Sequence, residues 1–121
     1  MVIEKRKFPR ADIICKISTV YGERPLVLES HTENIGEGGI RVILAHKLNV
    51  TTTVDLDLFL SKNEARINCK GEVVWANEMR PQGVTPHLYD TGIKFTEIIE
   101  HDKNSIRQLV RSLVEEGKKE K

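Results

Sequence analysis

The sequence predicts an all-β protein with one C-terminal helix, built as a six-stranded antiparallel β-barrel. Two observations lead to this class: apolar and polar residues alternate in short segments from about residue 12 to residue 96, and a single helical pattern follows them. Strands joined by hairpin-length connections, with no helices between them, favour antiparallel pairing. Closing such a sheet into a barrel removes the exposed edges that it would otherwise present.

Six segments carry the strand pattern. In the clearest one, residues 54–60, apolar side chains alternate with Asp55 and Asp57, which we expect to face solvent. We expect a turn at Tyr21–Pro25 and a loop over 77–86, which is rich in Asn, Arg, Pro and Gly. The six predicted strands are Ile13–Thr19, Leu26–Thr32, Gly39–Leu44, Val54–Leu60, Ile67–Trp75 and His87–Thr96.

The pattern then changes to that of an amphipathic helix. Asp102 is the expected N-cap and Gly117 the expected end of this helix. Its apolar face should pack on the open end or the flank of the barrel. The residues of that face are Ile106, Leu109, Val110, Leu113 and Val114. The predicted layout is a flexible basic arm over 1–11, a barrel over 12–99, the helix over 100–117 and a charged tail over 118–121.

Length and charge bound the function. The 121 residues fit one domain, and 19 Lys and Arg against 18 Asp and Glu give a net charge of +1. This near-neutral sum argues against a binder of long DNA or RNA, which usually carries a strong basic excess. The charge is unevenly spread, because residues 1–10 carry +3 and the rest of the chain therefore carries −2.

Other signals predict a reduced, metal-free protein of the cytoplasm. No apolar run approaches the ~20 residues of a membrane span, and the first residues lack the apolar stretch of a secretory signal. We therefore expect a cytoplasmic location and no membrane insertion. Cys15 and Cys69 lack metal-ligand spacing and should be packed thiols, while the four histidines form no paired metal motif. No cofactor is expected.

A basic segment precedes the first predicted strand. Its sequence is Arg6-Lys7-Phe8-Pro9-Arg10, with the two arginines four positions apart. Pro9 blocks a regular helix, so we expect an extended arm. Because the planar guanidinium donates two parallel hydrogen bonds and stacks on flat rings, the pair suits phosphate and guanine. By itself, a basic arm is more often a solvated tail.

A glycine-rich turn lies between the second and third predicted strands. Its sequence is Asn34-Ile35-Gly36-Glu37-Gly38-Gly39. Three glycines in four residues permit backbone conformations closed to other residues, and they allow a ligand to approach closely. Asn34 can donate and accept hydrogen bonds, as the edge of a base requires. By itself, the segment is more often an ordinary β-turn, and it is not a P-loop.

Together the two motifs carry a family resemblance. An RxxxR just before the first strand, followed about two dozen residues later by an (Asp/Asn)xSxxG-like turn, resembles the PilZ domain family, bacterial receptors for cyclic di-GMP. Further similarities are Gly39–Val42, Gly71–Trp75 and Gly92–Phe95. The resemblance covers about residues 5–115. It implies a six-stranded antiparallel barrel with a C-terminal helix, in agreement with the strand pattern.

The resemblance also implies roles for individual residues. Arg6 and Arg10 correspond to the arginines that clamp phosphate and guanine, and Asn34 to the residue that hydrogen-bonds a guanine edge. Gly39 is the closing glycine, where a side chain would crowd the ligand. Gly36 stands where the family usually has serine, so one hydroxyl contact is absent. We expect weaker binding as a result, by up to about tenfold.

Four residues are secondary candidates for the ligand site. Lys5 and Lys7 would add local positive field, and Arg41 faces either the site or solvent. Trp75 is placed to flank the nucleotide, but its alternating strand position favours the core by about two to one. We expect Trp75 to be a core residue on this ground.

These features predict a receptor that performs no catalysis. Cyclic di-GMP would order the N-terminal arm and so change the surface that an unidentified effector protein meets. We expect a monomer or weak dimer with no DNA or RNA partner. The alternative is a PilZ-like adaptor that binds no nucleotide. A binder of single strands would need more stacking aromatics than the 5% present, and an enzyme would need a nucleophile–base pair, which the sequence lacks.

Overall fold

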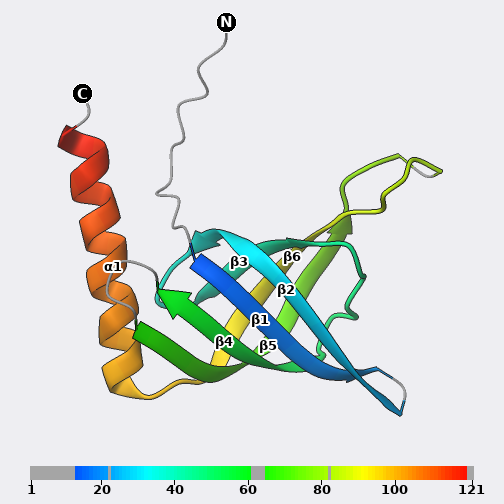
Figure 1. The fold of residues 1–121 in the computed structure, drawn as a ribbon, viewed down its shortest axis with the longest axis horizontal. Coiled ribbons are helices and arrows are strands. Elements are labelled where there is room, and N and C mark those ends of the chain that lie inside the picture. The colour runs from blue at the N-terminus through cyan, green and yellow to red at the C-terminus, as the bar shows by residue number, and fades with distance from the viewer. Residues whose placement is uncertain (1–12, 22, 61–64, 82, 120–121) are drawn as a thin grey trace, which may run out of the picture.

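The computed structural model describes residues 13–21, 23–60, 65–81 and 83–119. Within these ranges the chain forms six strands and one helix, and the strands close into a barrel with the helix at one end (Figure 1). The strands are β1 (Ile13–Tyr21), β2 (Arg24–Ile35), β3 (Gly39–Leu44), β4 (Thr53–Leu60), β5 (Ala65–Glu78) and β6 (Tyr89–Glu97), and the helix is α1 (Glu100–Lys119). The predicted fold class is confirmed.

Every neighbouring pair of strands in the barrel is antiparallel. The order around the barrel is β1-β2-β3-β6-β5-β4, and β4 pairs with β1 to close it. The alternating residues point into a single apolar core, as the sequence predicts. Leu56 and Leu58 on β4 are fully buried, whereas Asp55 on the opposite face is exposed. Burial of these apolar side chains is the main term that stabilises the barrel.

Several predicted boundaries are wrong by a few residues. Arg24 and Pro25 belong to β2 rather than to a turn, because Tyr21 already pairs with Arg24 and Val20 with Pro25. β5 runs to Glu78, so the loop before β6 spans 79–88 instead of 77–86. In both places strand pairing continues through polar or Pro residues that alone indicate a loop, because the partner strand supplies hydrogen bonds.

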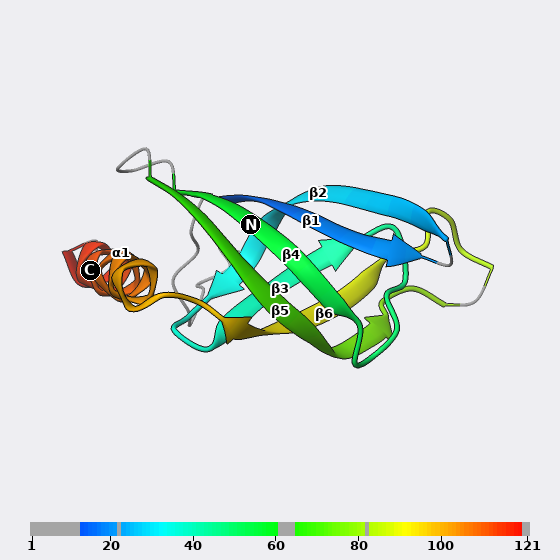
Figure 2. The same cartoon turned by 90° about the horizontal axis from the view of Figure 1, so that it is seen from below.

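The helix differs from its prediction at the N-cap and at the C-terminal end. It starts at Glu100, so Asp102 lies in the first turn rather than at the N-cap, where its charge still suits the positive end of the helix dipole. It continues past Gly117 to Lys119. Ile106 and Leu109 are buried in the same cluster as the barrel core. Both views show the helix beside the end of the barrel where β2 ends and β3 begins (Figures 1 and 2).

Three irregularities interrupt the pairing, all in two strand pairs. Between β2 and β3, Glu33 is an extra residue, because Thr32 pairs with Val42 and Asn34 with Arg41. Between β5 and β6, two further shifts occur, at Lys70/Gly71 and at Val73/Trp75. The pairs β1–β2, β1–β4 and β4–β5 show no such shift. β-Bulges of this kind re-aim side chains and often lie beside binding sites.

The two cysteines are free thiols inside the barrel. Cys15 on β1 and Cys69 on β5 are both buried. Burial raises the pKa of Cys15 to about 12, and the nearby Cys69 thiol and Asp57 carboxylate add to this effect. The prediction of packed, unpaired thiols is confirmed. Within the described part of the chain, no group of metal-ligating side chains gathers, and no helix has the length and apolar character to cross a membrane.

Candidate functional site

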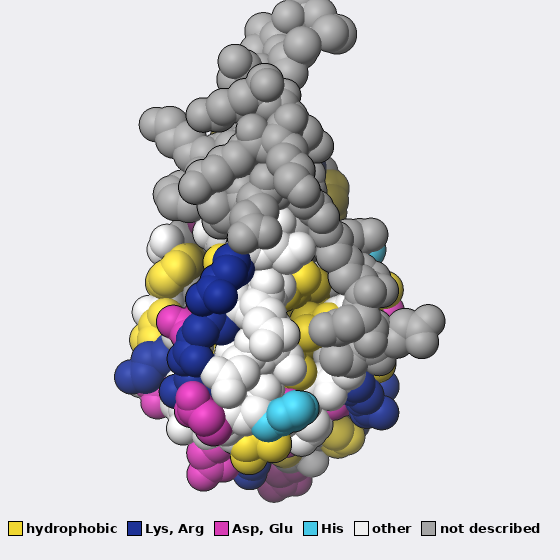
Figure 3. All heavy atoms as spheres, turned by 90° about the vertical axis from the view of Figure 1, so that its left-hand side faces the viewer, with side chains coloured by type: hydrophobic (Ala, Val, Ile, Leu, Met, Phe, Trp, Pro, Cys, Tyr) yellow, Lys and Arg dark blue, Asp and Glu magenta, His cyan; other side chains and the backbone are white. Residues whose placement is uncertain are grey.

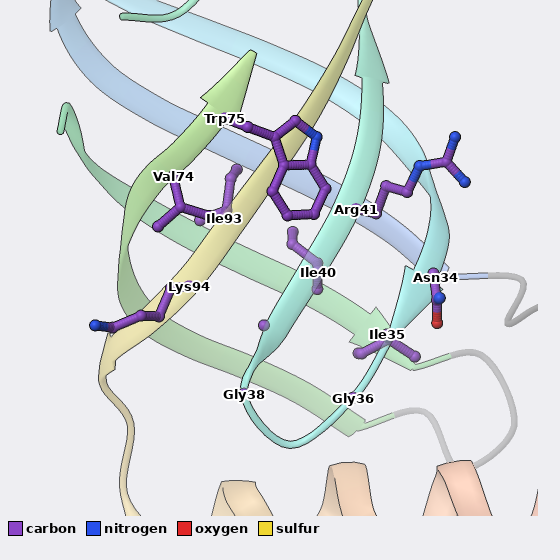
Figure 4. A pocket seen from close by; sticks show the side chains of 11 residues that line it. Asn34, Ile35, Gly36, Gly38, Ile40, Arg41, Val74, Trp75, Ile93 and Lys94 are labelled. Carbon is purple, nitrogen blue, oxygen red and sulfur yellow. The ribbon is translucent and has the colours of Figure 1, made fainter. Parts of the chain in front are cut away.

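A pocket of about 390 Å³ lies on the outer face of the barrel, over β3, β5 and β6 (Figure 4). The turn between β2 and β3 forms one rim, with Asn34, Gly36 and Gly38 among the lining residues. The side chains of Arg41, Trp75 and Lys94 line the rest. This volume is within the usual range for small-molecule sites.

Strand register places four residues of this region in one row. Asn34 on β2 pairs with Arg41 on β3, Arg41 pairs with Gly92 on β6, and Gly92 pairs with Trp75 on β5. Cross-strand partners have neighbouring side chains on the same face of the sheet. The row therefore brings an amide, a guanidinium and an indole together from four strands. The row depends on the bulge at Glu33 in β2 and the bulge at Val74 in β5, because these extra residues set the register of Asn34 and Trp75.

Trp75 points out of the barrel, so its prediction as a core residue is wrong. The indole is 40% exposed and lies across β6 in the pocket (Figure 4). The reason is the bulge at Val74: alternation along β5 places Val73 inside and should place Trp75 inside too, but the extra residue shifts the phase. Val73 is fully buried, whereas both Val74 and Trp75 are exposed.

Arg41 is held by a bidentate ion pair. Its Nε donates to Asp90 Oδ1 at 2.8 Å and its Nη2 donates to Asp90 Oδ2 at 3.2 Å. The hydrogen bond to Asp90 raises the pKa of the guanidinium above its ordinary value, and the Asp90 and Glu33 charges add to this. Two parallel bonds fix the plane of the guanidinium. Arg41 therefore lines the pocket with its guanidinium turned to Asp90.

Lys94 is a second cation in the pocket, and the sequence prediction missed it. It lies on the outer face of β6 opposite Gly39, and its ammonium extends from the pocket wall (Figure 4). No ion pair joins it to another described residue, in contrast to Arg41. Glu72 on β5 is nevertheless its cross-strand neighbour, so a carboxylate lies near Lys94 without forming an ion pair.

The turn itself is anchored at both ends by backbone hydrogen bonds. Gly36 N donates to Gly39 O at 3.0 Å, and Phe95 N on β6 donates to Gly38 O at 2.9 Å. None of the three glycines has the left-handed backbone conformation expected for such a turn. A β-carbon on Gly39 would lie 2.1 Å from Ile93 O on β6. Close packing of the two strands therefore requires a glycine here, whether or not a ligand binds.

Helix α1 contacts the turn through an ion pair. Arg107 Nε donates to Glu37 Oε1, and Arg107 also donates to Asn104 on its own helix. The close-up shows α1 running beneath the turn (Figure 4). On this end of the molecule, Lys and Arg side chains form a band with Asp and Glu beside it (Figure 3). The pocket, the turn and the helix are thus neighbours at one end of the barrel.

Of the predicted ligand residues, five lie in the pocket. They are Asn34, Gly36, Gly39, Arg41 and Trp75. The other four lie outside the described residues; they are Lys5, Arg6, Lys7 and Arg10.

Gly92, Lys94 and Asp90 were not predicted as part of the site. A glycine inside a strand often marks a close approach, and this signal was present at Gly92. No sequence signal marks Asp90, because its role depends on the register of β6 against β3.

Solved structures with the same fold include PilZ proteins that bind cyclic di-GMP. The PilZ domain of Escherichia coli YcgR with cyclic di-GMP aligns with a TM-score of 0.68 at 11% identity, covering 97% of each chain. Apo MrkH from K. pneumonia gives 0.74 at 15% identity over 99% of this chain and 54% of MrkH. Bacillus subtilis MotI, an inhibitor of motility, gives 0.60 at 20% identity over 94% of this chain and 52% of MotI.

These likenesses show a shared fold. The chain spans about half the length of MrkH and MotI. A complex of MrkH with cyclic di-GMP also aligns, at a TM-score of 0.73 and 17% identity. No curated protein sequence matches significantly. The family profile of the PilZ domain matches residues 4–112, nearly the whole chain, and the chain therefore belongs to the PilZ domain family.

Proposed function

We propose that this chain is a receptor for cyclic di-GMP and that the ligand binds in the pocket beside the Asn34–Gly39 turn. The observation that carries the proposal is the row Asn34–Arg41–Gly92–Trp75, which places a hydrogen-bonding amide, a fixed guanidinium and an exposed indole side by side. YcgR and MrkH, which share the fold, have structures with this nucleotide.

The chemistry of the ligand matches these groups. Cyclic di-GMP has two flat guanines and two singly charged phosphodiesters. Trp75 offers a flat apolar ring for a guanine, and stacking of this kind contributes about 1–3 kcal/mol per base. Asn34 donates and accepts hydrogen bonds, as a guanine edge requires. Lys94, which forms no ion pair with another described residue, offers an ammonium for a phosphate, whereas Arg41 is fixed by Asp90 and presents the face and remaining edge of its guanidinium.

Arg6 and Arg10 complete the proposed site from the N-terminal arm. β1 is antiparallel to β2 and Ile14 pairs with His31, so β1 begins near the end of β2, where the turn starts. Arg10 precedes Ile13 by three residues in the sequence, and three residues of extended chain span at most about 11 Å. The barrel end that carries the turn is therefore within reach of both arginines.

The proposed output is a change of surface. A basic arm that closes over the nucleotide would lose conformational freedom and would cover part of the barrel end near α1. An effector protein that contacts this end would meet a different surface in the two states. In this proposal the chain relays the signal and leaves the nucleotide intact.

Isothermal titration of the full chain with cyclic di-GMP tests the proposal. We expect saturable binding, and we expect Arg6→Ala and Arg10→Ala each to remove most of the affinity. Arg24→Ala is the matched control, because Arg24 is an exposed arginine at the opposite end of β2, and it should bind like the wild type. Recovery of unchanged nucleotide by chromatography would support a receptor without catalysis.

The alternative is an adaptor of the same fold that binds no nucleotide. An absence of heat at tens of micromolar protein, confirmed by an absence of change in backbone amide NMR shifts, would favour this alternative and overturn the receptor proposal. Binding that survives both arginine substitutions would retain the receptor but remove the arm from the site.

A further inference from the structure

Gly92 is buried although it lies on the outer face of the barrel. It pairs with Arg41 on one side and with Trp75 on the other, and the indole of Trp75 covers it. A β-carbon built on Gly92 would lie 2.4 Å from Cε3, 2.5 Å from Cδ2 and 2.5 Å from Cε2 of Trp75. These separations are far inside van der Waals contact, so no other residue fits here while the indole stays in place.

The three distances also define how the ring lies. Cδ2 is bonded to both Cε3 and Cε2 and belongs to both rings of the indole, so no atom can approach it closely within the ring plane. A point almost equally far from all three atoms must therefore lie above one face. The indole rests with this face on the backbone of Gly92, and 40% of the residue remains exposed to solvent.

We infer that Gly92 is a positioning residue for the ligand site, because it supports the Trp75 indole flat across β6 so that the opposite face receives a base. The inference rests on the proposed function and adds to it the residue that sets the stacking surface. Since the stacking energy of an aromatic pair depends on parallel overlap, a side chain that tilts or lifts the indole would remove the surface without removing Trp75.

The same geometry explains why the row contains a glycine between two large side chains. Arg41 and Trp75 are on strands that flank β6, and the atoms nearest to the position of a β-carbon at residue 92 all belong to Trp75. Arg41 is turned to Asp90, two residues along β6 from Gly92. The space that a side chain at residue 92 would fill is thus occupied by the indole.

The test uses Gly92→Ala, and Trp75 as the probe, because it is the one tryptophan in the sequence. We expect this variant to show a red-shifted emission and faster acrylamide quenching without ligand, since the displaced indole is more exposed. We expect its affinity for cyclic di-GMP to fall by about 5- to 150-fold, the loss that corresponds to one stacked base.

A double-mutant cycle separates positioning from general damage. If Gly92 acts through the indole, Gly92→Ala should change the affinity by less than about twofold in a Trp75→Ala background, where the crowding ring is absent. Gly71→Ala is the matched control. It crowds Ile93 and Leu56 in the core, so it should lower stability while leaving Trp75 quenching as in the wild type.

Unchanged quenching and unchanged affinity in folded Gly92→Ala would overturn the inference, as would an equal loss of affinity in the Trp75→Ala background. If the wild type does not bind cyclic di-GMP, the proposed function fails and with it the base-stacking role. The quenching comparison without ligand would still decide whether Gly92 supports the indole, so the two failures can be told apart.

Discussion

The two sides of the barrel are built in different ways. On the regular side, formed by the pairs β1–β2, β1–β4 and β4–β5, register continues without a shift. On the pocket side, formed by β2–β3, β3–β6 and β5–β6, three shifts occur and the pocket lies among them. The register shifts are therefore confined to the side of the barrel that carries the pocket, whereas both sides contribute residues to the core.

Exposed aromatic residues illustrate this division. Phe59 on the regular side and Trp75 on the pocket side are 38% and 40% exposed. The Arg66 guanidinium lies over the Phe59 ring at 5.4 Å from its centroid, and Arg66 also pairs with Asp57. A cation thus covers the exposed ring on the regular side, whereas the indole on the pocket side lines a hollow.

The largest expected effect of a single substitution is on the stability of the protein, at a core position of the regular side. Leu56→Ala would leave a cavity at a fully buried position in the middle of β4, and we expect it to lower the free energy of unfolding by about 2–5 kcal/mol. Because Leu56 does not line the pocket, the affinity of the folded protein for cyclic di-GMP should stay within about twofold of the wild type. Urea denaturation and titration at low temperature measure the two quantities.

A large loss of affinity in a Leu56→Ala protein that is still folded would contradict the division between the two sides. It would mean that the core of the regular side holds the pocket residues in place. A loss of stability alone would support the division.

The next effect is on binding, and it compares the two exposed aromatics. Trp75→Ala should lower the affinity for cyclic di-GMP by about 1–3 kcal/mol through the loss of one stacked base. Phe59→Ala removes a ring of similar exposure from the other side and should leave the affinity unchanged. Titration calorimetry of both variants measures the difference.

An equal loss of affinity in the two variants would show that the exposure of an aromatic ring, and not its position on the pocket side, determines its contribution to binding. A loss in Phe59→Ala alone would move the binding surface to the regular side and so contradict the proposed site.

The same contrast explains what could be read from the sequence. On the regular side, period-two alternation predicted the inward faces of β1 and β4 correctly, because each strand keeps one phase from end to end. On the pocket side, the same rule placed Trp75 inside. The run Val73-Val74-Trp75 interrupts the alternation of apolar and polar residues, as a β-bulge does. Only the pairing of Trp75 with Gly92 shows which residue is extra.

Residues that line the pocket were predicted where a motif lies on one segment, and contacts between distant strands were missed. Asn34, Gly36 and Gly39 belong to a single turn and were found together. The ion pair between Arg41 and Asp90 joins residues 49 positions apart, and the contact of Glu37 with Arg107 joins residues 70 apart. Such contacts depend on strand order and on where the helix packs, which residue types at short spacing do not encode.

A third prediction concerns pH and the thiols inside the barrel. Burial raises the pKa of both Cys15 and Cys69 from an ordinary value of 9.0 to about 12, and nearby charges add to the effect. Between these values the unfolded chain loses its thiol protons while the folded barrel keeps them. The free energy of unfolding should therefore fall as pH rises from about 9 to 12, by about 1.4 kcal/mol per pH unit for each thiol, with no such slope below pH 9.

Denaturation in urea between pH 8 and 11 measures this slope. Cys15→Ala is the control, because it removes one thiol while the Lys and Tyr residues that also titrate remain. Its slope should be shallower than that of the wild type, and an identical slope would show that the Cys15 thiol ionises equally in both states.

The smallest expected effect is a gain of affinity at the turn. A β-carbon on Gly36 meets nothing within 4 Å, and the residue has no left-handed backbone conformation, so Gly36→Ser should fold like the wild type. The added hydroxyl restores the residue that the family usually carries there, and one neutral hydrogen bond is worth about 0.5–1.5 kcal/mol. We expect cyclic di-GMP to bind up to about tenfold more tightly, as measured by titration calorimetry.

Gly38→Ser is the matched control, because Gly38 lies in the same turn with the same open space around it. A gain in Gly36→Ser alone would place the ligand against the first half of the turn, beside Asn34 and Arg41. An equal gain in both variants would indicate a general effect of added polarity, and a loss in Gly36→Ser would mean that the ligand approaches the backbone so closely that even one hydroxymethyl group obstructs it. That last result would mean that the pocket needs a glycine at position 36. The sign of the change in affinity therefore decides whether Gly36 lacks a hydrogen bond to the ligand or leaves space that the ligand needs.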